Sequence, residues 1–146
     1  MTDPKLTDFL DRLRKAAKGT FWDYLGATLD SCSPEQVVVS LDIRPEHLNF
    51  LGILHGGVYA ALIDSAMGLA AMTAKPGASV VTTNLNLHFV APVEKGTVRV
   101  YAEVVHESRK SVTTQAYARN ESGELCAFGT GTFRVVDRPM PAERSG

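Results

Sequence analysis

A strongly apolar segment occupies the middle of the chain, at residues 58–72. Its small and aliphatic side chains are not confined to one stripe, which is typical of a helix that is covered on all sides. Two glycines, Gly56 and Gly57, stand where this helix should begin, and Asp64 is the only formally charged residue between them and residue 73. We therefore expect a buried central helix that carries one carboxylate in largely apolar surroundings.

On both sides of this helix, apolar and polar positions alternate as they do in β-strands that pack on one face. Two strands are predicted before it, at residues 26–32 and 36–43, and four after it, at residues 79–89, 96–107, 111–120 and 124–136. Most of the links between consecutive strands are short, which requires the neighbouring strands to be antiparallel.

The N-terminal segment has the period of an amphipathic helix, predicted at residues 4–17 with Pro4 in its first turn and Thr2 or Asp3 as its cap. Residues 21–25 are interpreted as a hydrophobic plug that leads into the first strand. Residues 137–146 lack an apolar pattern and are predicted to form a flexible tail. We find no internal repeat, so residues 1–136 are predicted to be a single domain.

These elements predict an α+β fold, in which an antiparallel sheet of about six strands curls around one long helix. A single sheet covers only one side of a helix. The other side needs further protein, so a second copy of the chain is expected there.

Composition narrows the possible partners. The formal net charge is −1 and the basic residues are scattered, so no nucleic-acid surface is indicated. No apolar run precedes Cys32, so no secretory signal is expected. The two cysteines, Cys32 and Cys126, lack C-x-x-C spacing, which favours reduced thiols in a cytoplasmic protein, although one disulfide stays open as an alternative. The central segment is long enough to span a membrane, but Asp64 would cost roughly 3 kcal/mol there. A buried core helix is therefore predicted, with no membrane partner.

Several kinds of catalytic site find no support in the sequence. The histidines lack paired ligand spacing and H-E-x-x-H is absent, so we expect no metal. The nucleophile elbow G-x-S-x-G and the phosphate loop G-x-x-x-x-G-K-[ST] are also absent. The remaining candidate chemistry lies at the start of the central helix and at Asp64.

Unpaired N–H groups at Gly56 and Gly57, together with the helix dipole, can stabilise an oxyanion. The glycines could instead only permit close packing. Asp64 can serve as a general base or as a nucleophile, or it can be a buried carboxylate held by a neighbour such as Ser65. Gly56 and Asp64 are separated by about 12 Å along the helix axis. If both act on one carbonyl group, the carboxylate must therefore come from another subunit.

The motif N-x-x-G-x-x-H-G-G followed by six residues and D, and then by S-A-M-G, resembles the hotdog-fold acyl-CoA thioesterases. It is most similar to the phenylacetyl-CoA and hydroxybenzoyl-CoA thioesterase branch, and the stretch T-N-L-N-L-H-F-V-A-P resembles the third strand of that family. The motif residues are Asn49, Gly52, His55, Gly56, Gly57 and Asp64.

The resemblance implies a hotdog dimer with a continuous sheet, and often a homotetramer formed as a dimer of dimers. It implies that the Gly56 N–H polarises the thioester carbonyl and that Asp64 of the facing subunit acts as base or nucleophile. Asn49 would hold the carbonyl or the water. Thr82 would orient the water, or it is only a strand residue of good β-propensity. His55 would position the loop or the thioester, or make a structural hydrogen bond.

Substrate contacts are predicted from the same resemblance. The acyl pocket would be lined by Phe50, Leu54, Tyr59 and Met67, with Gly57 nearby, although each could also be ordinary packing. Arg109 and Lys110 in a hairpin could meet coenzyme A phosphates, or they could form only a solvated turn. Ala91 stands where relatives place an arginine before Pro92, so no phosphate contact is predicted at that position.

The sequence thus predicts a cytoplasmic acyl-CoA thioesterase that needs neither metal nor cofactor beyond its coenzyme A substrate. Two alternatives share the fold. A hotdog enoyl-CoA hydratase or dehydratase normally pairs a His with an acidic residue, and the motif found here fits hydrolysis better. A non-catalytic acyl-CoA-binding protein would need no carboxylate at Asp64.

Overall fold

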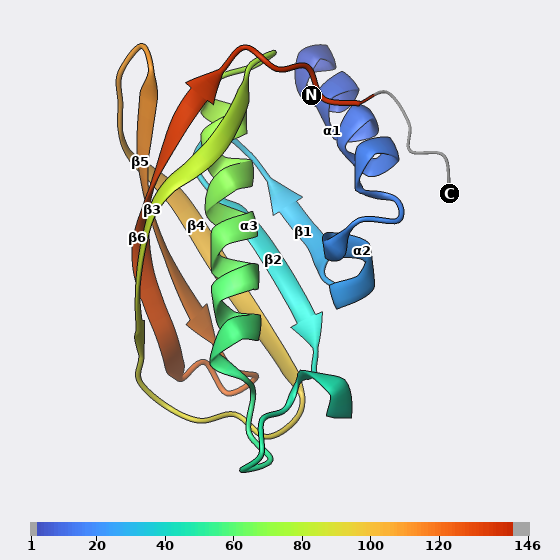
Figure 1. The fold of residues 1–146 in the computed structure, drawn as a ribbon, viewed down its shortest axis with the longest axis vertical. Helices are drawn as coiled ribbons and strands as arrows, with labels where there is room; N and C mark the ends of the chain where they lie inside the picture. The colour runs from blue at the N-terminus through green and yellow to red at the C-terminus, as the bar shows by residue number, and fades with distance from the viewer. Residues whose placement is uncertain (1–2, 142–146) are drawn as a thin grey trace.

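A six-stranded antiparallel sheet curls around one long helix (Figure 1) in the computed structural model, which describes residues 3–141. The strand order across the sheet is β1-β2-β4-β5-β6-β3. Along the chain the elements are α1 (Pro4–Ala17), α2 (Phe21–Leu25), β1 (Thr28–Cys32), β2 (Val37–Asp42), η1 (Pro45–His47), α3 (Gly56–Ala74), β3 (Ser79–Phe89), β4 (Thr97–Glu107), β5 (Ser111–Arg119) and β6 (Leu125–Val136). The predicted fold class is confirmed.

The N-terminal region differs in one respect from the prediction. Residues 21–25 form a short helix, α2, rather than only a hydrophobic plug, and Gly26 ends it with a φ of 85°. The first strand therefore begins at Thr28 instead of residue 26. The predicted helix at residues 4–17 is confirmed, and Asp3 caps it by accepting a hydrogen bond from the Lys5 N–H.

The end of α2 is fixed to the loop after β2. The buried ring of His47 lies between two backbone groups: its Nδ1 accepts from the Arg44 N–H at 2.9 Å and its Nε2 lies 2.9 Å from the Leu25 carbonyl oxygen. The Arg44 guanidinium also donates to the Tyr24 and Leu25 carbonyls. These contacts satisfy carbonyl groups that a helix end leaves free. By contrast, the most extensive backbone contacts of α1 are with α2.

The core lies between α3 and the inner face of the sheet. Leu62, Ile63 and Met67 of α3 are fully buried there. Helix and sheet are so close at β6 that a Cβ on Gly131 would lie only 2.8 Å from the Met67 methyl group. By length and apolar composition α3 could also cross a membrane, but the buried core helix of a globular domain can have the same length and composition. Here α3 packs against five of the six strands.

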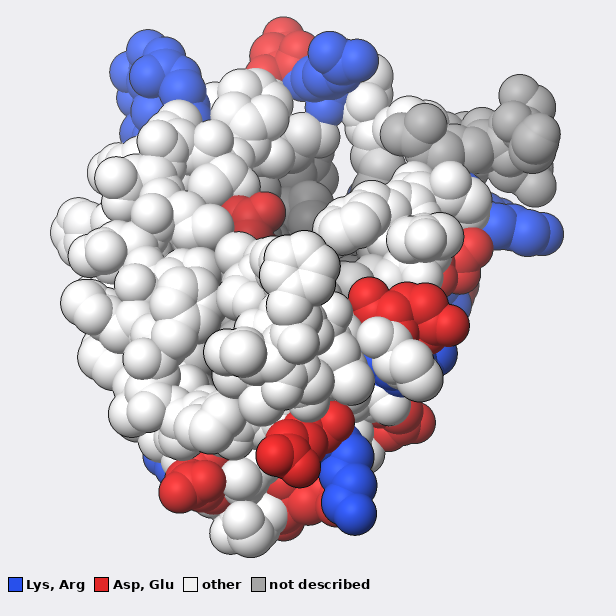
Figure 2. Space-filling view, turned by 60° about the horizontal axis from the view of Figure 1, so that its bottom comes forward, with Lys and Arg blue, Asp and Glu red and all other residues white. Residues whose placement is uncertain are grey.

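The outer edge strand β3 has a neighbour on one side only, β6. Its apolar residues Val81, Leu85 and Phe89 are exposed, and so are Phe50 and Leu51 in the loop before α3. Figure 2, which turns the lower end of the molecule forward, shows a broad face with charged side chains mostly around its margin. One protomer thus leaves an apolar edge and face uncovered.

The predicted C-terminal tail is only partly described. Residues 137–141 contain no helix or strand, and residues 142–146 lie outside the described residues.

Candidate active site

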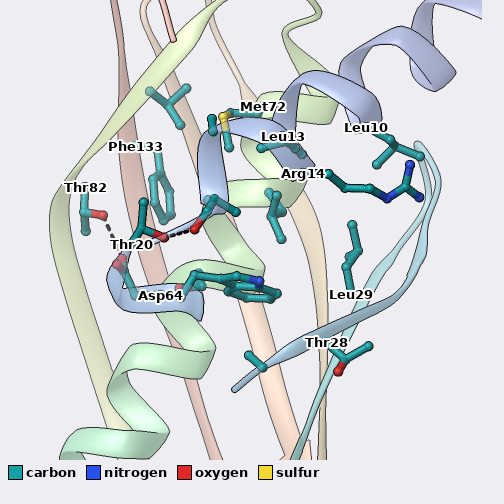
Figure 3. Close-up of a pocket in the computed structure, with 18 residues that line it drawn as sticks. Leu10, Leu13, Arg14, Thr20, Thr28, Leu29, Asp64, Met72, Thr82 and Phe133 are labelled. Atoms are coloured by element: carbon teal, nitrogen blue, oxygen red, sulfur yellow. Dashed lines mark hydrogen bonds between the residues drawn. The ribbon is translucent and has the colours of Figure 1, made fainter. Parts of the chain in front are cut away.

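Asp64 lies in the third turn of α3, half-buried, and faces the edge strand β3. The Thr82 hydroxyl donates to Asp64 Oδ1 at 2.7 Å, as Figure 3 shows. The strand pairing shifts register directly after Thr82, and such bulges redirect side chains near active sites. Within residues 3–141, Asp64 Oδ2 accepts no hydrogen bond, and Ser65 does not bind the carboxylate. One carboxylate oxygen is therefore free for a substrate or a water.

The Asp64–Thr82 pair lies at the wall of a cavity of about 610 Å³ (Figure 3). The cavity is bounded by α1, α2 and β1 on one side and by α3, β3 and β6 on the other. Most of its surface is apolar. Its lining includes Leu10, Leu13, Arg14, Ala17, Thr20, Trp22, Leu29, Ser65, Gly68, Leu69, Met72, Val80 and Phe133. A carboxylate in such a setting matches the general pattern of a ligand-binding pocket with few polar groups.

A second polar feature is the start of α3. His55 is the N-cap, and its Nδ1 accepts from the Gly57 N–H at 2.7 Å, while the Val58 and Tyr59 N–H groups point to the His55 carbonyl. The Gly57 amide is thus occupied. The Gly56 N–H has no acceptor within residues 3–141, so it is the first-turn amide that remains free for a ligand.

Asn49 shapes the loop that leads to this helix start. Its Oδ1 accepts from the backbone N–H groups of Leu51 at 2.9 Å and Ile53 at 3.3 Å. The oxygen therefore holds the loop, and the side-chain NH₂ group has no acceptor in the described part of the chain. Asn49 is still able to donate hydrogen bonds to a ligand.

The two polar features belong to one helix but not to one cavity. None of Asn49, His55, Gly56 or Gly57 lines the cavity beside Asp64. One protomer therefore does not bring the Gly56 amide and the Asp64 carboxylate to the same carbonyl group.

The predicted acyl-pocket residues lie elsewhere. Leu54, Tyr59 and Met67 are buried in the core, and Phe50 is exposed on the loop; none of the four lines the cavity. The Tyr59 hydroxyl is buried and has no hydrogen-bond partner in the described region, and burial, with Cys126 beside it, raises the pKa of Tyr59 well above its usual value. A substrate contact for these residues stays a prediction.

The remaining predicted residues are at the surface or in the core. Arg109 and Lys110 are exposed in the hairpin between β4 and β5, and their contact with coenzyme A stays a prediction. Cys32 and Cys126 are free thiols, so the alternative of a disulfide is not realised. Within residues 3–141 no three His, Cys, Asp or Glu side chains gather in the manner of a metal site.

Sequence reasoning missed the contribution of the N-terminal helices to the cavity. The period of apolar residues in α1 predicts an amphipathic helix. It does not predict which part of the protein the apolar face of this helix will cover. The sequence therefore does not indicate that Leu10, Leu13 and Trp22 line the same cavity as Asp64.

Comparisons with known proteins agree with this architecture. The sequence pattern of the thioesterase superfamily matches residues 51–127. The Mycobacterium tuberculosis protein Rv1847 is 37% identical over 109 residues, which cover 72% of this chain and 78% of that protein. Human acyl-coenzyme A thioesterase 13 is 30% identical over 107 residues, covering 72% and 76%.

Solved structures give the same result. A mutant of the phenylacetic acid degradation protein PaaI from Thermus thermophilus superposes with a TM-score of 0.73 at 32% identity, covering 80% of this chain and 98% of that one. The thioesterase superfamily match at residues 51–127 includes Gly56, Gly57 and Asp64. The chain therefore belongs to the thioesterase superfamily and is a thioester hydrolase.

Proposed function

We propose that this protein is an acyl-CoA thioesterase, which hydrolyses an acyl-CoA to the free acid and coenzyme A. The observation that carries the proposal is the Asp64 carboxylate, bound by Thr82 at the wall of an apolar cavity and with one oxygen free. The likeness to human acyl-coenzyme A thioesterase 13 supports an acyl-CoA substrate. A thioester with an apolar acyl group fits a cavity of this composition.

In the proposed reaction, a water molecule attacks the thioester carbonyl carbon while Asp64 accepts its proton. The Thr82 hydroxyl proton is already donated to Asp64, so the Thr82 oxygen can accept a hydrogen bond from that water and orient it. The tetrahedral intermediate then breaks its C–S bond and releases coenzyme A as a thiolate, which takes up a proton. A direct attack by Asp64 would instead break the C–S bond, release coenzyme A as a thiolate and leave an acyl anhydride on Asp64, which water hydrolyses to the free acid.

The oxyanion would be held by the Gly56 N–H of a second protomer. This amide is free and lies at the positive end of α3. The NH₂ group of Asn49 would add a second donor. Because Gly56 and Asp64 of one chain lie about 12 Å apart along the helix, each active site would combine the two from different subunits.

The exposed edge of β3 and the apolar face beside it support the homodimer that such a site needs. The opposite face of the sheet offers a surface for pairing dimers into a homotetramer. There, Tyr101, Tyr117, Phe128 and His88 stand opposite one another on four adjacent strands. The tyrosine rings stack at 5.6 Å and the other two at 4.9 Å.

The activity is tested with a panel of acyl-CoAs and detection of released thiol. The wild-type protein should release coenzyme A, and Asp64→Asn should reduce kcat at least about 100-fold, because proton transfer by a positioned group contributes this much. Hydration of an enoyl-CoA without thiol release would show a hydratase. Binding of acyl-CoA without turnover of the panel would show a binding protein.

The composite site is tested by removing only the Gly56 N–H. Gly56→Pro does this at the first helical position, where proline is tolerated, and His55 already has the extended backbone that precedes proline. Gly56→Ala is the control, since its Cβ would meet Phe89 at an ordinary 3.6 Å. We expect kcat to fall about 10²–10³-fold in the proline variant, with little change in the alanine variant.

Mixing the two inactive proteins, unfolded together and refolded, then distinguishes the arrangements. Half of the dimers formed at random combine Asp64→Asn with Gly56→Pro protomers, and each of these has one intact composite site out of two. About a quarter of wild-type activity should return. No recovery despite confirmed subunit exchange would contradict a shared site.

A further inference from the structure

We propose that α1 forms the roof of a binding site for a linear aliphatic acyl chain of medium length, and that Leu10 and Leu13 set the preference for that chain. The inference rests on the proposed thioesterase function for the position of the thioester, at Asp64. It adds a substrate class and specificity residues, which come from a segment outside the matched residues 51–127.

The first support is the direction of the cavity. Asp64, Gly68 and Met72 all line it, and they follow one another at intervals of four residues on one face of α3. The cavity thus runs along the helix for about 12 Å from the carboxylate. With carbon–carbon bonds of about 1.5 Å, an extended chain of about ten carbons matches this length. Gly68, in the middle, has no side chain to obstruct the chain.

The second support is the change in polarity along the cavity. The hydrogen-bonding groups Asp64, Ser65 and Thr82 lie together at one end. Most of the remaining wall is apolar and includes Leu69 and Met72, while Arg14, Thr20 and Thr28 are its other polar residues. A mostly apolar wall with a carboxylate at one end suits a molecule with one reactive polar end and a long apolar remainder.

The third support is the volume. A ten-carbon chain fills more of the cavity of about 610 Å³ than a single aromatic acyl group does, and unfilled apolar space loses dispersion contacts. The lining also contains only two aromatic residues, Trp22 and Phe133, among many aliphatic ones. Both features favour an aliphatic chain over an aryl group.

The fourth support is the way α1 is held. Figure 3 places Leu10, Leu13 and Arg14 across the cavity from Thr82. Whereas the end of α2 is fixed by His47 and Arg44, the most extensive backbone contacts of α1 are with α2. Only Phe9 of this helix is buried, and Leu13 reaches the core from a partly buried position, so much of the apolar face of α1 covers a space. An acyl chain would fill that space.

A binding test uses Trp22, the only tryptophan in the chain, which lines the cavity. Titration with 12-bromododecanoate should quench its fluorescence saturably, because bromine quenches on contact, and unlabelled dodecanoate should reverse the quenching. The double variant Leu10→Ser/Leu13→Ser should bind at least about tenfold more weakly, since each leucine loses apolar contact. Leu6→Ser is the matched control: Leu6 lies on the same helix but not on this cavity.

The kinetic test compares kcat/KM for dodecanoyl-CoA with that for acetyl-CoA. This ratio should fall at least about tenfold in the double variant and stay within twofold in Leu6→Ser. Quenching without thiol release from any acyl-CoA would disprove the thioesterase but leave the chain site standing. Thiol release combined with absent quenching, or with an unchanged ratio in the double variant, would overturn the role of α1.

Discussion

Two hydrogen bonds in this molecule have the same chemistry and different surroundings. Thr82 donates to Asp64 at 2.7 Å, and Thr97 donates to Asp42 at 2.7 Å. The first joins the central helix to the edge strand beside an apolar cavity. The second joins directly opposed residues of β2 and β4 on the outer side of the sheet. The surroundings of a carboxylate, and not its hydrogen-bond partner, therefore make it a candidate for catalysis.

The largest difference between the pairs should appear in turnover. Asp64→Asn removes the proposed base, whereas Asp42→Asn changes an exposed group remote from the cavity. We expect kcat to differ between the two variants by at least about 100-fold, with Asp42→Asn close to wild type. Thiol release under saturating acyl-CoA measures this. Equal activities in the two folded variants would remove the distinction.

The threonines should differ by less. Thr82→Val removes the hydroxyl that is proposed to orient Asp64 and the water, so we expect kcat to fall about tenfold. Thr97→Val should not change kcat, and circular dichroism would verify that both variants fold. The conservative Thr82→Ser should restore most of the lost activity, because it keeps the donor. A valine variant as active as the serine variant would show that the hydroxyl is not used.

The smallest expected difference is in stability, and its direction is reversed: the Asp42 variant should be affected more than the Asp64 variant. Replacing Asp42 by Asn weakens a hydrogen bond to a charged group at the surface and should lower the free energy of unfolding by about 0.5–1 kcal/mol. Replacing Asp64 by Asn removes a charge from a largely apolar wall, so the free energy of unfolding should stay equal or rise. Urea denaturation of both variants measures the difference. A larger loss of stability at Asp64 would indicate a structural role.

The fold was largely predictable because its signals are local. The alternation in residues 79–89 predicted β3 to the residue, and the glycines marked the start of α3. The short helix α2 was missed, because five residues rich in aromatics have no helical period to detect. Its stability comes from distant partners, His47 and Arg44, which the sequence does not connect to it.

The site was predictable only in part. The motif led to Asp64 and Gly56, but the bond from Thr82 joins residues eighteen positions apart and depends on how β3 curves over α3. The cavity depends on a third segment, α1. Leu54, Tyr59 and Met67 are apolar and lie near the motif, and these same properties place side chains in a core.

The open edge of β3 makes a single protomer prone to aggregation. Its unpaired backbone amides and carbonyls, flanked by the exposed Val81 and Leu85, can pair with any extended chain. Self-association would both protect this strand and create the reaction centre. If the protein concentration fell below the dissociation constant of the dimer, the protein would then lose activity and solubility together.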